Sequence, residues 1–348
     1  MKLSDIAGVL EQVERGPDGS YRIVASRALD GKPLQGFRFY GTRPDDPNDV
    51  VPHEHRRELR GYGVFAAWLN HVDAKAINSF DTLVTEGGRS FVRHHLLDFG
   101  SALGSASVAP RAHWEGYDYL VEPSETWKQM LAFGFRFPAW HRVDFYEAPS
   151  IGRLPRDNMR FDPDQWKPRV PNPAFIRARA DDKFWAAQKL IALTDDLLRA
   201  AVRAGQLDDS RAEEFLIKAL AERRDAIGRA YLAAVNPIAD PALDSGGALT
   251  FRNAAVDAGV AAAPASYRAE WFAFDNATRE SRPIGTTSAG TPRLVAPFGL
   301  AAVSSDFIRI ALSAASRSNR SWESPVDAYF RRDGSGWRLV GFERLPET

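Results

Sequence analysis

The chain has 348 residues, 45 Lys and Arg against 45 Asp and Glu, a pI near 7.1 and no cysteine. The absence of cysteine excludes disulfides, thiolate metal sites and a cysteine nucleophile. The neutral overall charge argues against a nucleic-acid partner and a general membrane-surface role, but it leaves room for a local charged patch. The 44% hydrophobic content is sufficient for well-packed cores.

The length predicts more than one domain. We expect three sections: residues 1–57 as a short mixed β and loop segment, 58–235 as a mainly helical domain, and 236–348 as a β-rich domain. The fold class is therefore predicted to be α+β. No apolar run approaches the roughly 20 residues of a membrane span. No basic start followed by an apolar stretch is present, so we expect no signal peptide. The compartment stays open, with the cytoplasm as default and a secreted parent lacking its leader as the alternative.

The first section opens on a helix-like run at residues 4–13. Short strands are predicted over residues 21–28 and 36–41, around a turn at Asp30-Gly31. A loop with three prolines follows at residues 44–52.

The second section begins with a predicted helix over Glu58 to Asn70, whose apolar residues, Trp68 among them, recur on one face. Strands are predicted over residues 80–84 and 91–97, joined by a hairpin at residues 86–88. A long irregular loop is expected at 138–173. Helices are expected over 181–204 and 210–235, with Asp209 at the start of the second.

Residues of the types used in phosphoryl transfer lie on either side of the hairpin, in a polar loop over residues 71–78 and in a turn at residues 98–100. Before it, His71, Asp73, Lys75 and Asn78 follow the spacing H-x-D-x-K-x-x-N, and after it comes Asp98-Phe99-Gly100. This order of a polar loop, a hairpin and D-F-G resembles the catalytic centre of the protein-kinase-like superfamily, and the resemblance covers residues 58–104. It implies that residues 58–235 form a domain similar to a kinase C-lobe.

The resemblance also implies roles for individual residues. Asp73 would orient or deprotonate the acceptor hydroxyl, and Lys75 would contact the transferred phosphate. Asn78 and Asp98 would bind Mg²⁺, and together with Gly100 they would hold the nucleotide, with ATP as donor. The acceptor stays open between a protein, a small molecule and a glycan. We expect Asp73, Asn78 and Asp98 to converge, and the two carboxylates to repel one another when no metal is bound.

The first 57 residues lack the signature of a kinase N-lobe. They contain no G-x-G-x-x-G, and their only lysines are Lys2 and Lys32. We therefore expect a degenerate or truncated lobe, or a chain that is a piece of a longer protein. This absence supports an alternative function, an inactive kinase-like scaffold or binding module.

Two other interpretations stay open. Asp73 and Asn78 are of the types that close loops after helices, so they could be purely structural. Five of the seven histidines lie between residues 53 and 95. His53 and His55, together with Asp73 and Asp98, could form the transition-metal site of a hydrolase.

The C-terminal section has strand-like runs at residues 267–274, 307–313, 325–331 and 337–343, the last two joined by a hairpin at 332–336. We expect a small β-sandwich-like domain. Trp271, Trp322 and Trp337 could bind carbohydrate if they are exposed, although core packing is the favoured role.

Overall fold

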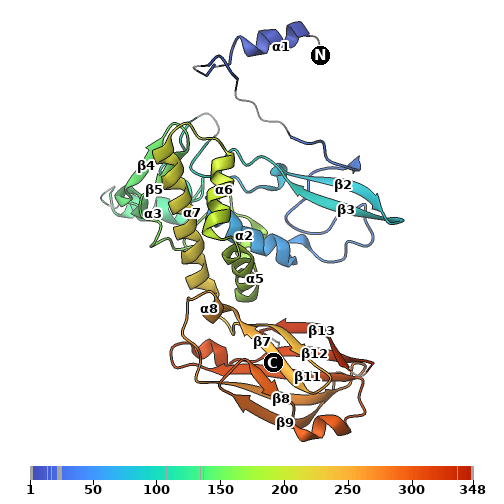
Figure 1. Ribbon diagram of the computed structural model, residues 1–348. Coiled ribbons are helices and arrows are strands. Elements are labelled where there is room, and N and C mark those ends of the chain that lie inside the picture. Colours follow the sequence, from blue (N-terminus) through green and yellow to red (C-terminus); the bar gives the residue numbers. More distant parts are fainter. Residues whose placement is uncertain are drawn as a thin grey trace. The chain divides into compact units, whose positions relative to one another are not determined.

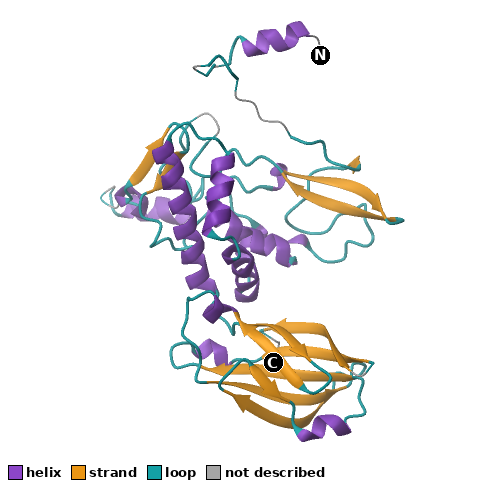
Figure 2. Cartoon of the chain, viewed as in Figure 1, coloured by secondary structure: helices purple, strands orange, loops and turns teal. Residues whose placement is uncertain are grey.

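The computed structural model describes residues 3–345 apart from residues 14, 17, 22–25, 107–108, 134, 136 and 335 (Figure 1). Helices and antiparallel sheets both contribute, so the mixed α+β class is confirmed (Figure 2). The chain divides into two compact units. The first contains Met1–Phe37 and Ser79–Leu96, and the second contains Arg38–Asn78 and Leu97–Thr348. The domain boundaries expected after residues 57 and 235 stay predictions.

The first unit contains one helix and a three-stranded antiparallel sheet. Its elements are α1 (Leu3–Leu10), β1 (Lys32–Pro33), β2 (Ser79–Glu86) and β3 (Arg89–Leu96), with strand order β1-β2-β3. The predicted hairpin is confirmed, and Gly87 and Gly88 provide the positive φ values of its turn. The strand predicted over residues 21–28 falls partly outside the described residues. The strand predicted over 36–41 is wrong, because Phe37 donates its N–H to the side-chain hydroxyl of Ser79 and not to a backbone carbonyl of β2.

Helices form the first part of the second unit. They are α2 (Arg57–Leu69), α3 (Pro123–Leu131), α4 (Pro173–Ile176), α5 (Ala180–Ile191), α6 (Asp195–Ala204) and α7 (Ser210–Tyr231), with short 3₁₀ turns at His53–His55, Ala76–Asn78 and Ala139–Arg142. The core between α2, α5 and α7 includes Trp68, which donates its indole N–H to the Leu220 carbonyl at 2.9 Å. No described helix has the length and apolar character needed to cross a membrane.

The helix predicted over 181–204 is two helices. Thr194 starts α6 by accepting a hydrogen bond from the Leu197 N–H, which breaks the run after α5. Asp209 caps α7 as predicted, accepting from the N–H groups of Arg211 and Ala212. The second helix is shorter than predicted, because α7 ends at Tyr231.

The irregular loop expected at 138–173 contains a short hairpin, β4 (Phe145–Ala148) and β5 (Gly152–Pro155). Its turn requires glycine, since Gly152 has φ of 75° and its backbone meets that of Gly104, which has φ of 87°. The N–H groups of Arg111 and Arg153 both donate to the Gly104 carbonyl, at 3.0 and 2.9 Å. The loop that follows D-F-G is therefore hydrogen-bonded to this hairpin through Gly104.

The C-terminal part has two antiparallel sheets. One has the order β10-β7-β6, from β6 (Ile238–Leu243), β7 (Ala248–Asn253) and β10 (Arg293–Val295). The other has the order β13-β12-β11-β8-β9, from β8 (Ser266–Phe274), β9 (Ser281–Ala289), β11 (Phe307–Ala315), β12 (Val326–Asp333) and β13 (Gly336–Arg344). A short helix, α8 (Ala254–Asp257), follows β7.

The four strands predicted in this section are confirmed as β8, β11, β12 and β13, and the predicted hairpin joins the last two, although Ser335 in its turn lies outside the described residues. Sequence reasoning missed β9. Its Pro283 is tolerated because β9 is an edge strand. Trp271 and Trp322 are fully buried, so a carbohydrate-binding role for these two is wrong and core packing is confirmed.

Candidate functional site

The end of α2 positions the polar loop. Asn70 adopts the left-handed conformation that commonly ends helices, with φ of 52°, and its N–H bonds back to the Ala67 carbonyl. The His71 N–H bonds to the Ala66 carbonyl at 2.8 Å. The Asn70 side chain accepts a hydrogen bond from the Trp166 indole at 2.9 Å. The direction in which the loop leaves the helix is thus determined by both backbone and side-chain contacts.

Asp73, Lys75 and Asn78 are in direct contact. The Lys75 ammonium lies 2.5 Å from one Asp73 carboxylate oxygen, and Asn78 Nδ2 donates to the other at 3.0 Å and to the Asp73 carbonyl at 2.9 Å. These bonds assign the orientation of the Asn78 amide, with the nitrogen toward Asp73. Its Oδ1 is therefore the remaining acceptor, and no described residue donates to it.

The surroundings of Asp73 favour its ionised form. Burial opposes ionisation, but the hydrogen bonds from Lys75 and Asn78, together with the charges of Lys75 and Arg169, outweigh it and lower the pKa of Asp73. The expected repulsion among acidic groups is wrong for Asp73, because two cations lie closest to it. At neutral pH this carboxylate is a strong hydrogen-bond acceptor and a weak base.

Arg169 and Glu115 complete this arrangement from outside the motif. The Arg169 N–H donates to the Val72 carbonyl at 2.8 Å, and its guanidinium lies 3.6 Å from Asp73. The same guanidinium donates to the buried Glu115 carboxylate, whose second oxygen accepts the Ala112 N–H. Sequence reasoning missed both residues, and no spacing signal links positions so far apart in the chain.

The D-F-G turn returns to the polar loop. The Leu97 N–H donates to the Asn78 carbonyl at 2.8 Å, and the Phe99 ring packs on His71 with a centroid separation of 5.3 Å. Asp98 has φ of 54°, an uncommon conformation for a residue other than glycine, and its carboxylate accepts the Gly100 N–H at 3.2 Å.

His71 is the buried centre of this cluster. Burial lowers the pKa of His71, and the negative charges of Asp73 and Asp98 act in the opposite direction. The structure joins Asp73, Lys75 and Asn78 by direct contacts. Asp98 and Gly100 are connected to these three residues through the contacts of Leu97 and Phe99. Among the described residues, the Asp98 carboxylate makes no hydrogen bond to Asp73 or Asn78.

The histidine-based metal site gains no support. His53 is buried, with one ring nitrogen 2.7 Å from an Asp49 carboxylate oxygen and the other 2.5 Å from the Arg38 carbonyl. Within the described ranges, no group of three or more His, Asp and Glu side chains is arranged to hold a metal ion.

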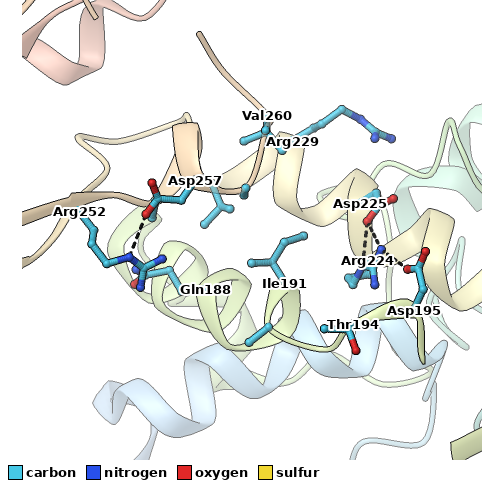
Figure 3. A pocket seen from close by; sticks show the side chains of 15 residues that line it. Gln188, Ile191, Thr194, Asp195, Arg224, Asp225, Arg229, Arg252, Asp257 and Val260 are labelled. Carbon is cyan, nitrogen blue, oxygen red and sulfur yellow. Dashed lines mark hydrogen bonds and ion pairs between the residues drawn. The ribbon is translucent and has the colours of Figure 1, made fainter. Parts of the chain in front are cut away.

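The larger cavities of the second unit lie away from these residues. One of about 780 Å³ is lined by residues of α5, α6, α7, β7 and α8 (Figure 3). Arg224 in its wall pairs with Asp195 and Asp225, and Arg252 pairs with Asp257. A second, of about 420 Å³, is lined by Asn70 at the end of α2 and by Tyr117, Trp166 and Arg223. The predicted site residues line neither cavity.

Comparison with protein-family models, with curated proteins and with solved structures gives no match to this chain. The kinase-like resemblance is therefore based on the sequence motif alone, together with the contacts among Asp73, Lys75 and Asn78.

Proposed function

We propose that this chain is a kinase-like phosphotransferase that uses ATP and Mg²⁺. The observation that supports this most directly is the orientation of Asn78. Its amide nitrogen is engaged by Asp73, which leaves its oxygen, the atom a hard cation prefers, as the open acceptor.

The residues have distinct roles in this proposal. The Asp73 carboxylate accepts a hydrogen bond from the acceptor hydroxyl and orients it for attack, since its lowered pKa makes it a poor base. The Lys75 ammonium, 2.5 Å from Asp73, is in place to neutralise charge on the transferred phosphoryl group. Arg169 holds Asp73 from the other side.

The donor set fits magnesium. The Asn78 Oδ1 and the exposed Asp98 carboxylate are both oxygen ligands, and sites for Mg²⁺ commonly use one or two protein ligands and leave the rest to nucleotide phosphates and water. When bound, the ion would neutralise phosphate charge. The contact between Phe99 and His71 links the segment that carries Asp98 to the polar loop.

The N-terminal region favours a second candidate function, an inactive kinase-like scaffold or binding module. Its described residues before Arg57 form an eight-residue helix, a two-residue strand and a 3₁₀ turn, with no five-stranded sheet. Without the backbone donors of a glycine-rich loop, the β- and γ-phosphates lose most of their partners. We therefore expect weak binding of nucleotide by this chain.

Thermal shift and phosphate transfer, measured with the same protein, separate the candidates. Millimolar Mg-ATP should raise the melting temperature of the wild type, since a ligand that binds only the folded state stabilises it. Asp98→Asn and Asn78→Ala should abolish this shift. Asp73→Asn should retain it while abolishing transfer of labelled phosphate from ATP. Asp333→Asn, at an exposed position on β12, is the matched control and should change neither result.

Two outcomes would decide against catalysis. A Mg-ATP shift without any transfer to itself or to added acceptors supports the scaffold. No shift at millimolar Mg-ATP, in a protein that melts cooperatively, contradicts nucleotide binding by this chain.

A further inference from the structure

The cavity of about 420 Å³ has a buried cation in its wall. Arg223 is 3% exposed, and its guanidinium donates only to neutral oxygens, those of two backbone carbonyls and of the Asn158 side chain. In the larger cavity, by contrast, Arg224 and Arg252 both pair with carboxylates (Figure 3). A guanidinium has five N–H groups, so two of those of Arg223 have no partner among the described residues.

A second buried guanidinium adds positive charge near this cavity. Arg111 is 1% exposed, and none of its side-chain nitrogens has a hydrogen-bond partner in the described part of the chain. Its charge acts on Arg223 and Tyr117, which both line the cavity. Burial lowers the pKa of Arg111 to about 10 and that of Arg223 to about 9, so both stay charged at neutral pH. The carboxylate that acts on Arg111 is that of Glu115, and it is already bound by Arg169. A buried charge normally has a partner of opposite sign, and positive charge is in excess here.

The exposed residues of the cavity lining carry balanced charges. They include three arginines and three aspartates, namely Arg142, Arg156, Arg160, Asp144, Asp157 and Asp162. Arg223 therefore gives the whole lining a net charge of +1. A singly charged anion would neutralise this charge, whereas a phosphate dianion would leave an uncompensated negative charge in a desolvated site.

The half-buried part of the lining is aromatic. It consists mainly of Tyr117, Phe161 and Trp166, and the Phe161 ring centroid lies 3.6 Å from the Arg223 guanidinium carbon. The Tyr117 hydroxyl has no hydrogen bond to any described residue. Burial raises the pKa of Tyr117, against the opposing charges of Arg223 and Arg111, so the phenol stays protonated and is a donor at neutral pH. The lining thus combines an apolar surface with hydrogen-bond donors of net positive charge.

We propose that this cavity binds a small monocarboxylate that carries an apolar ring. Its carboxylate accepts hydrogen bonds from the Tyr117 hydroxyl and from the free N–H groups of Arg223, and its ring contacts the aromatic side chains of the lining. A volume of about 420 Å³ is within the range of small-molecule sites, which are typically apolar with a few polar groups. The inference is independent of the phosphotransferase proposal, because Asp73, Lys75, Asn78 and Asp98 do not line this cavity.

Titration calorimetry of the full chain with benzoate tests the proposal. Benzoate should bind, and benzamide, which has the same shape without the charge, should bind roughly tenfold more weakly or worse. Acetate lacks the ring and inorganic phosphate carries more charge, so both should also bind more weakly than benzoate.

Variants place the binding in this cavity. Tyr117→Phe should weaken benzoate binding by roughly tenfold, because a hydrogen bond to a charged group is lost. Val143→Phe enlarges another side chain of the lining and should weaken binding as well. Tyr329→Phe is the matched control, because Tyr329 is half-buried on β12 and does not line the cavity, and it should bind benzoate like the wild type.

Three results would overturn the proposal. The first is no binding of benzoate at millimolar concentration, since ordered water alone would then satisfy the buried guanidinium groups. The second is binding of benzamide, acetate or phosphate as tightly as benzoate. The third is unchanged benzoate affinity in both Tyr117→Phe and Val143→Phe. Unchanged melting temperatures of the variants show that a loss of binding is not a loss of folding.

Discussion

Replacing Trp68 tests the packing that holds the polar loop in place. Trp68 lies in the last turn of α2, three residues before His71, and is 8% exposed. Its indole N–H bonds to the Leu220 carbonyl on α7, 152 positions along the chain. Trp68→Ala removes both the ring and this bond, so we expect a loss of about 3–5 kcal/mol in the free energy of unfolding.

Trp68→Phe separates the two contributions. It retains most of the ring packing and loses the hydrogen bond, which predicts a smaller loss of about 1–2 kcal/mol. Urea unfolding followed by circular dichroism gives both values, provided that the slope of the transition is unchanged. Trp127→Ala is the control, because Trp127 is 62% exposed and should change stability by less than about 0.5 kcal/mol.

Two results would contradict this prediction: a cost of less than about 1 kcal/mol for Trp68→Ala, or an equal cost for Trp68→Phe and Trp68→Ala. The first result would mean that Trp68 is not in the core. The second would mean that the hydrogen bond, and not the packing of the ring, accounts for the stabilisation.

The remaining predictions concern charged groups. Asp73→Asn should destabilise the protein by about 1–2 kcal/mol at neutral pH. Because the pKa of Asp73 is lowered in the folded state, this difference should be fully present above a pH of about 4 and disappear as the pH falls through the lowered value. Urea unfolding at several pH values measures it, and a difference that grows in acid would mean that Asp73 is repelled by neighbouring acids. Arg223→Gln should cost about 2–3 kcal/mol, because the buried guanidinium bonds to the Ala67 and Trp68 carbonyls at the end of α2. Arg223→Lys should recover only part of this loss, since one ammonium cannot match the guanidinium fork. Thermal melting compares the two variants, and full recovery by lysine would contradict the bidentate role.

The polar loop could be predicted from the sequence because each of its signals is local. The helical period of α2, the alternation in β2 and β3 and the glycines between them extend over short stretches of chain. Asp73, Lys75 and Asn78 lie within six residues, so the 3₁₀ turn at Ala76–Asn78 is enough to bring them into contact.

Short edge strands and broken helices were harder to predict. β9 contains Pro283, which reads as a strand breaker until its position at the sheet edge is known. Thr194 splits a continuous helical pattern because its side chain caps α6, a local effect that the apolar period conceals.

The α+β class, most helices and strands, and the polar residues of the loop follow from local patterns in the amino-acid sequence. Three features are visible only in the folded protein: Arg169 and Glu115 hold Asp73, His53 is hydrogen-bonded to Asp49, and the apolar side chains of α3 are exposed. The difference follows from how far apart in the sequence the interacting residues lie. Periodicity and turn chemistry act between near neighbours, whereas ion pairs and exposure depend on which distant segments the folded chain brings together.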